Sequence, residues 1–90
     1  TSSFDAAVDA YELNNQEIAL SATLDLISND KNNDQYYELI AKIYYSIGDL
    51  DNSNINIVKA IEIKNDNESY RKFQRKLEEL KNNIKMLNII

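Results

Sequence analysis

A chain of 90 residues has room for one small hydrophobic core, so we expect a single domain. The chain holds one Gly and no Pro, which argues against an all-β fold because such folds need turn residues at short intervals. Its net charge is −5. The chain has no Cys, which excludes disulfides and thiolate chemistry, and no His, which excludes the commonest metal ligand and general base. We therefore expect no enzyme, no cofactor and no metal site.

The first predicted helix spans about residues 3–13. Its apolar side chains recur at helical spacing and are Phe4, Ala7, Val8 and Tyr11. Because Asn14 is followed three residues later by Glu17, the pair has the pattern of a capping box and predicts a second helix that ends near Ser28. The apolar residues of this second helix are Ile18, Ala19, Ala22, Leu24, Leu26 and Ile27.

The third predicted helix spans about residues 34–47 and again has one apolar face. Gly48 should end it, because Gly readily adopts the left-handed conformation that terminates many helices. Asp49 can then cap a fourth helix over about residues 50–64.

The fifth predicted helix starts near Asn67 and is the longest, and Asn65 with Glu68 forms a second capping-box pattern before it. Its apolar residues are spaced alternately three and four apart, which is typical of a stripe that packs along a neighbouring helix. These residues are Tyr70, Phe73, Leu77, Leu80, Ile84 and Leu87. We expect the first half of the stripe to cover three residues of the fourth helix, Ile57, Ala60 and Ile61.

The end of the fifth helix should extend beyond its neighbours. At about 1.5 Å per residue, a helix from Asn67 to the C-terminus is about 35 Å long, against roughly 21 Å for the helices beside it. The overhanging residues are too apolar to stand free in water. We therefore expect them to pack against a second copy of the chain, against a partner or back on the body, with dimerisation the preferred interpretation. The candidate self-association residues are Ile84, Leu87 and Ile90.

The predicted helix-turn-helix units repeat with a period typical of one protein family. Loops recur near residues 14, 31, 48 and 65, and two such steps span about 34 residues, the period of tetratricopeptide repeats (TPRs). Residues 34–67 resemble one TPR, whose first helix carries a large aromatic residue, Leu, a small residue and Tyr. The matching residues are Tyr37, Ile40, Ala41 and Tyr44, followed in the second helix by Ser53, Ile57 and Ala60.

The rest of the chain resembles the family less closely. Residues 1–33 resemble a degenerate repeat, with Ser3 and Ala10 at the aromatic and Tyr positions, and residues 68–90 resemble the capping helix that closes a TPR array. The resemblance implies one domain over residues 1–90. It also implies an all-α fold in which antiparallel helical hairpins stack as a right-handed array of about five helices. Another helical-hairpin array or a bundle would suit the same apolar stripes.

The resemblance also implies a function, because TPR domains are interaction scaffolds or adaptors that bind a peptide or helix of a partner protein in a concave groove. The groove positions of the family correspond to Tyr11, Glu12, Gln35, Glu38, Lys42, Tyr45 and Ser46, flanked by Lys76 and Glu79. Tyr suits such a surface because its ring offers contact area and its hydroxyl offers direction. The alternative interpretation of Tyr45 is that it packs against the neighbouring helix.

One subclass of TPR ligand is not expected. TPR domains that bind the C-terminal carboxylate of a chaperone use Lys, Asn and Arg at set groove positions. The corresponding positions here hold Phe4, Val8 and Leu39, so the cationic clamp is missing.

Other site types fit the sequence poorly. Asp30-x-Asn32-x-Asp34 begins like a calcium loop but lacks the required Gly and the final Glu. Residues 1–70 carry 13 acidic and 4 basic side chains, so we expect no nucleic-acid partner for the domain. Residues 71–90 carry 6 basic and 2 acidic side chains, which we interpret as a solvated helix face, with an acidic partner, anionic lipid or nucleic acid as the alternative.

The second functional hypothesis is a structural one, a homodimerising helical adaptor that uses its last helix as the contact. The chain shows neither a signal-peptide pattern nor an apolar run long enough to span a bilayer, so we expect a cytoplasmic location and no membrane span. Light scattering on the isolated chain would separate the two hypotheses.

Overall fold

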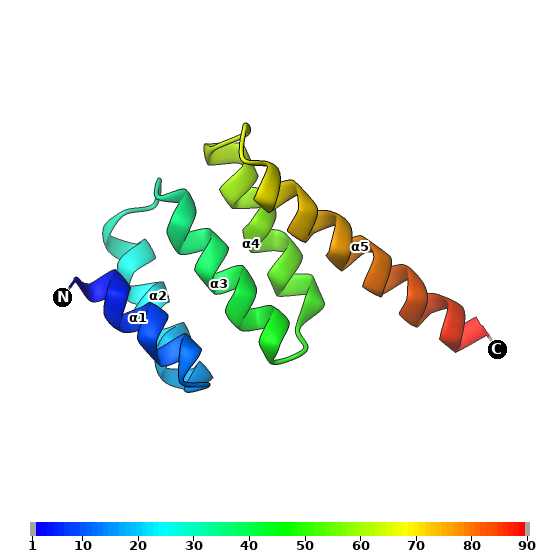
Figure 1. Ribbon diagram of the computed structural model, residues 1–90, viewed down its shortest axis with the longest axis horizontal. Coiled ribbons are helices and arrows are strands. Elements are labelled where there is room, and N and C mark those ends of the chain that lie inside the picture. Colours follow the sequence, from blue (N-terminus) through cyan, green and yellow to red (C-terminus); the bar gives the residue numbers. More distant parts are fainter. Residues whose placement is uncertain (1, 90) are drawn as a thin grey trace.

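The structure is a computed structural model that describes residues 2–89 and the side chains of residues 2–88. Within these residues every regular element is a helix, as expected for an all-α fold (Figure 1). The helices are α1 (Ser3–Glu12), α2 (Gln16–Asn29), α3 (Asp34–Ser46), α4 (Leu50–Ile63) and α5 (Glu68–Ile89). Among the described helices, none combines the length and the apolar character that a membrane crossing requires.

The five helices follow one another side by side across the molecule. Figure 1 shows the α1–α2 hairpin at one end, the α3–α4 hairpin in the middle and α5 running along α4 before it extends past the body. Each helix packs against the next one in the chain, and α1 also contacts α3. The result is an elongated molecule that measures 49 × 29 × 18 Å.

The turns of the two hairpins have the same backbone hydrogen bonds, displaced by the repeat period that the loop spacing predicts. The amide of Asn15 donates to the carbonyl of Ala10 at 2.8 Å, and the amide of Asp49 donates to the carbonyl of Tyr44 at 2.9 Å. The residue before each of these amides has a positive φ, 66° for Asn14 and 84° for Gly48. Gly48 therefore ends α3 in the left-handed conformation, as the sequence predicts.

The helix N-termini correct two details of the capping prediction. Asn14 does not cap α2, because it occupies the left-handed position that ends α1 and its side chain accepts from Gln16 Nε2 at 3.0 Å. The residue that precedes α5 as its cap is Asn67, whose Oδ1 accepts the amide of Ser69 at 3.0 Å, so the predicted Asn65–Glu68 capping box is wrong. The predicted cap of α4 is confirmed, since Asp49 Oδ1 accepts the amide of Asn52 at 3.1 Å.

Two clusters of buried side chains hold the helices together, and α3 contributes to both. The first cluster joins α1, α2 and α3 through Ala7, Ala10, Ala19, Leu39 and Ile43. The second joins α3, α4 and α5 through Tyr37, Ala41, Ile57, Ala60, Tyr70 and Leu77. Ile61 and Phe73 pack against the second cluster, so the first half of the α5 stripe covers α4 where the sequence predicts.

The two halves of α5 have different surroundings. Tyr70 and Leu77 are 2% and 0% exposed, whereas Ile84, Met86 and Leu87 are 48%, 64% and 72% exposed. The end of the helix therefore does not fold back on the body within the described residues, which removes one of the three expected arrangements. Ile90, the third candidate self-association residue, lies outside the described residues.

Candidate functional site

The central part of the predicted groove is one face of α3. Glu38, Lys42 and Tyr45 follow each other at intervals of four and three residues, so they lie along the same side of the helix. The carboxylate of Glu38 lies 3.6 Å from the Lys42 ammonium. Ser46 continues this face, but its hydroxyl donates to the carbonyl of Ile43 at 2.6 Å, within its own helix. Gln35 is exposed in the first turn of α3.

Tyr45 is the residue at which α3 meets α5. Its ring packs against the second buried cluster and lies edge-on to Phe73, with 5.7 Å between the ring centroids. The ammonium nitrogen of Lys76 lies 5.0 Å from the Tyr45 ring centroid, within cation–π range. Tyr45 remains partly exposed, so it both packs against the neighbouring helix and contributes to the surface.

The predicted groove residues on α1 are more peripheral. Tyr11 is partly buried against the first cluster, in the position that Tyr45 holds one repeat period later, and Glu12 is exposed. Beside them, Phe4 contacts Tyr36 of α3 with 5.4 Å between ring centroids. The structure thus brings Tyr45 and Lys76 together, whereas Tyr11 packs against the first buried cluster.

Two aromatic residues were missed when the groove was predicted from the sequence. Phe73 was interpreted only as part of the stripe that covers α4, yet it contacts Tyr45. Tyr36 lies one repeat period before the buried Tyr70, and this spacing is the signal that marks it as a residue at a helix contact. Phe73 and Glu79, which is exposed on α5, thus join Tyr45 and Lys76 in a surface of aromatic rings and mixed charges, whereas Tyr36 lies at the contact with Phe4 of α1.

A hydrogen bond from Tyr70 fixes the spacing of α3 and α5 beside this face. The Tyr70 hydroxyl donates to Asp34 Oδ2 at 2.5 Å, which joins the N-terminal turns of the two helices. Burial raises the pKa of the Tyr70 hydroxyl well above its usual range, and the bond to Asp34 raises it further. Because the pKa is raised in the folded state, the stabilisation that this bond gives is complete below about pH 10, the ordinary pKa of Tyr, and is lost as the pH rises from there through the raised pKa of the folded chain.

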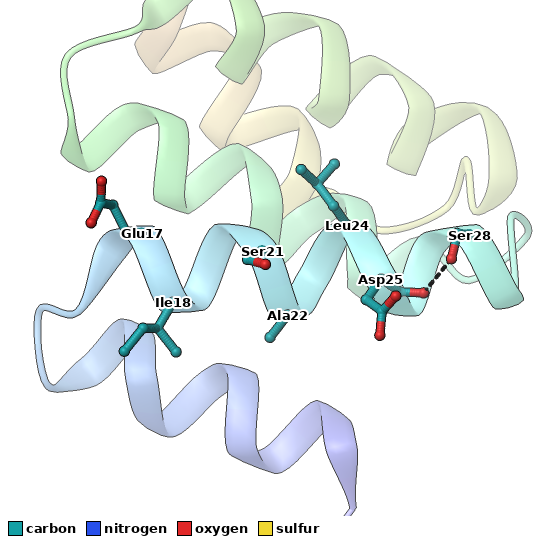
Figure 2. Close-up of a pocket in the computed structure, with 7 residues that line it drawn as sticks. All are labelled: Glu17, Ile18, Ser21, Ala22, Leu24, Asp25 and Ser28. Carbon is teal, nitrogen blue, oxygen red and sulfur yellow. Dashed lines mark hydrogen bonds between the residues drawn. The ribbon is translucent and has the colours of Figure 1, made fainter.

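Two hollows on the surface lie outside the predicted groove. One, of about 640 Å³, runs along the outer side of α2, where Figure 2 shows its lining side chains. These are Glu17, Ile18, Ser21, Ala22, Leu24, Asp25 and Ser28. A second, of about 450 Å³, lies between the α3–α4 turn and the far half of α5, where Lys81 Nζ and Asp51 Oδ1 form an ion pair at 2.8 Å.

The described residues offer no group of three or more His, Cys, Asp or Glu side chains arranged to hold a metal ion. Two carboxylates with a lowered pKa lie at helix N-termini. Hydrogen bonds from the side chain and amide of Asn52 lower the pKa of Asp49, and the hydrogen bond and charge of Arg75 lower the pKa of Glu68.

The chain matches no family model and no curated protein sequence. The face on α3 and α5 presents aromatic rings, hydrogen-bond groups and charges of both signs.

Proposed function

We propose that the chain is a TPR-like scaffold that binds a peptide or helix of a partner protein along the face formed by α1, α3 and α5. The observation that carries this proposal is Tyr45, a partly exposed ring held between Phe73 and Lys76 at a helix junction. Tyr residues fixed in this way are typical binding hot spots, because their rotamers are already restricted before the partner arrives.

The repetition of the backbone supports the TPR-like part of the proposal. The two hairpin turns repeat their hydrogen bonds after one period, and so do the asparagine caps, since Asn33 accepts the amide of Gln35 as Asn67 accepts that of Ser69. Ala7 and Ala41, which are also one period apart, are both fully buried. Small residues at this spacing let successive helices approach closely, as a stack of TPRs requires.

The proposal is tested with peptides selected from a random display library against the whole chain. Tyr45→Ala should weaken binding of a selected peptide by roughly 5- to 150-fold, corresponding to about 1–3 kcal/mol for an aromatic anchor. The control is Ile55→Ala, which truncates a residue that is 51% exposed on α4, away from α3 and α5. Fluorescence anisotropy gives the affinity, and circular dichroism checks that each variant is folded.

Unchanged affinity of a folded Tyr45→Ala variant would remove Tyr45 from the binding surface. If that variant unfolds, its ring is required for the core, and Lys76→Glu then tests the same face through an exposed residue. Peptides that bind equally well to Lys76→Glu and to the wild type would contradict the proposed surface.

A second candidate function is self-association through the end of α5. The observation that favours it is the exposure of Ile84, Met86 and Leu87 on a helix whose first half is buried. Exposed apolar residues grouped at one point of a small domain mark an interaction surface. A single species of monomer mass at high micromolar concentration would exclude this function.

A further inference from the structure

Two of the apolar surfaces that are exposed on the described part of the chain lie at opposite ends of the molecule. The first is the α5 tip, residues 81–88, whose apolar side chains are Ile84, Met86 and Leu87. The second is the α2 face, the hollow of about 640 Å³ lined by residues 17–28. Within this hollow Ile18 is 61% exposed and Leu24 is 48% exposed, on either side of the smaller Ser21 and Ala22 (Figure 2).

The two surfaces have opposite charge. Residues 1–30 carry six acidic side chains and no basic one, and Glu17 and Asp25 of this set line the α2 face itself. The α5 tip carries two Lys and no acidic residue. Lys81 pairs with Asp51 of its own chain, whereas Lys85 is exposed and belongs to none of the ion pairs among the described residues. The α2 face thus combines apolar side chains with negative charge, and the α5 tip combines apolar side chains with positive charge, so the two surfaces are complementary.

The shapes and positions of the two surfaces decide how they can meet. The α5 tip projects from the body, and the α1–α2 hairpin lies at the opposite end of the molecule (Figure 1). Over a longest dimension of 49 Å, the tip cannot reach the α2 face of its own chain. It can reach only the α2 face of another copy.

We propose that the α5 tip of one copy docks on the α2 face of a second copy, so that copies join head to tail. The inference rests on the self-association proposed above and supplies the surface that receives the tip. Such a contact uses different patches on the two partners, so it leaves a free tip and a free face after each addition. Short chains of copies therefore form in place of a closed symmetric dimer.

The contact is weak and depends on salt. One helix end of two to three turns buries less than the roughly 800 Å² per partner of a standard interface. Attraction between the Lys side chains and the acidic face adds to the apolar contact, and screening reduces it as salt rises. Association should therefore appear at tens to hundreds of micromolar chain and decrease at high ionic strength.

The test uses two variants of the complete chain in analytical ultracentrifugation. Met86→Gln with Leu87→Gln disables the tip and keeps the α2 face, while Ile18→Gln with Leu24→Gln disables the face and keeps the tip. All four side chains are at least 48% exposed, so Gln, a good helix former, should leave the fold intact. Each variant alone should remain monomeric, and an equimolar mixture should form a species of two chains and nothing larger.

The alternatives give different patterns. If the α5 tips paired with each other, the α2-face variant would still dimerise, which would overturn the head-to-tail contact but leave the proposed self-association standing. A wild-type chain that stays monomeric at high micromolar concentration would overturn both. A mixture that stays monomeric, although the wild type associates, would also overturn the head-to-tail contact.

Should Ile18→Gln with Leu24→Gln fail to fold, Glu17→Lys with Asp25→Lys tests the same face, and unimpaired association of that variant would count against the contact.

Discussion

The α1–α2 and α3–α4 hairpins have the same backbone geometry at their turns but different buried side chains. Their turns form the same hydrogen bonds one repeat period apart, with Asn14 and Gly48 in the same left-handed conformation. The buried residues of the first hairpin that cluster with α3 are Ala side chains, whereas the buried cluster of the second hairpin contains Tyr37 and Ile57 and is joined by Tyr70 of α5. The hairpin geometry is therefore compatible with very different amounts of buried apolar volume.

What the hairpins have in common are small residues at the helix crossings. Ala7 and Ala41 are fully buried, and so are Ala19 and Ser53, which is again a pair separated by one period. Ser53 keeps its hydroxyl satisfied by donating to the carbonyl of Ala41 at 2.7 Å. The crossings thus determine how closely the helices approach, and the larger side chains fill the space that is left.

The largest difference between the hairpins should appear when equivalent core residues are truncated. Thr23 and Ile57 occupy the same position in the two hairpins and are both 0% exposed. Ile57→Ala leaves a cavity and should cost about 2–5 kcal/mol of the free energy of unfolding. Thr23→Ala removes one methyl group and a hydrogen bond to Ala19 within its own helix, and should cost about 1–2 kcal/mol. Urea unfolding measures the free energy of unfolding of both variants. Equal losses in this free energy would mean that the two buried clusters contribute equally to stability.

The shared crossings predict a similar penalty in both hairpins when a small residue is enlarged. Ala41→Leu and Ala7→Leu should each overpack a site that is 0% exposed and cost roughly 1–3 kcal/mol. Ala6→Leu, at an exposed position of α1, is the matched control and should be nearly neutral. A neutral effect of Ala41→Leu on the thermal unfolding midpoint would show that α3 does not press closely on its neighbour there.

A smaller difference is expected at the turns. A Cβ at Gly48 would meet nothing within 4 Å, so Gly48→Ala should destabilise only through the backbone strain of a φ of 84°, by about 1 kcal/mol. Asn14 already tolerates this conformation at a smaller cost than most residues, so Asn14→Gly should stabilise the chain by less than about 1 kcal/mol. Opposite signs of the two effects in chemical unfolding support the equivalence of the turns, and equal signs would contradict it.

Local features of the fold could be predicted from the sequence, because they depend on neighbouring residues. The five predicted helices match the observed ones to within one or two residues at the boundaries that the structure describes. The capping box at Asn14 was wrong because Asn is favoured in the left-handed position as well as at a cap, and the one at Asn65 was wrong because Asn67, another Asn of the same loop, caps α5. Sequence alone does not decide which Asn takes which role.

Features that depend on packing between distant helices could not be predicted. The family resemblance placed Lys76 at the flank of the groove, but the contact of Tyr45 with Phe73 requires the angle at which α5 crosses α3, which no local pattern gives. The hollow on α2 was missed for a different reason: this helix is apolar on most of its circumference, so its periodicity did not separate the exposed Ile18 and Leu24 from the core-facing residues. The assignment of the groove itself stays a prediction.

The smallest expected effect concerns the caps of the two second helices. Asp49 accepts the amide of Asn52, whereas Asn15, the equivalent residue in the first hairpin, makes no side-chain hydrogen bond to its helix. Hydrogen bonds from Asn52 lower the pKa of Asp49 below its ordinary value of 3.8, so ionised Asp49 stabilises the folded chain above that pH. This contribution should be lost as the pH falls below about 4, through the lowered pKa of the folded state.

Asp49→Asn keeps an acceptor for the amide but removes the titrating group. The urea midpoint of the wild type should therefore exceed that of Asp49→Asn at pH 7, and the difference should shrink and vanish as the pH falls through the lowered pKa of Asp49. The pKa of Glu68 is also lowered, by Arg75, but it titrates alike in both proteins and cancels in the comparison. The matching change Asn15→Asp should introduce a pH-dependent cap into the first hairpin if its turn is equivalent to the second. A midpoint for Asn15→Asp that is no higher than that of the wild type at pH 7 would show that the shared backbone of the two turns does not extend to their caps.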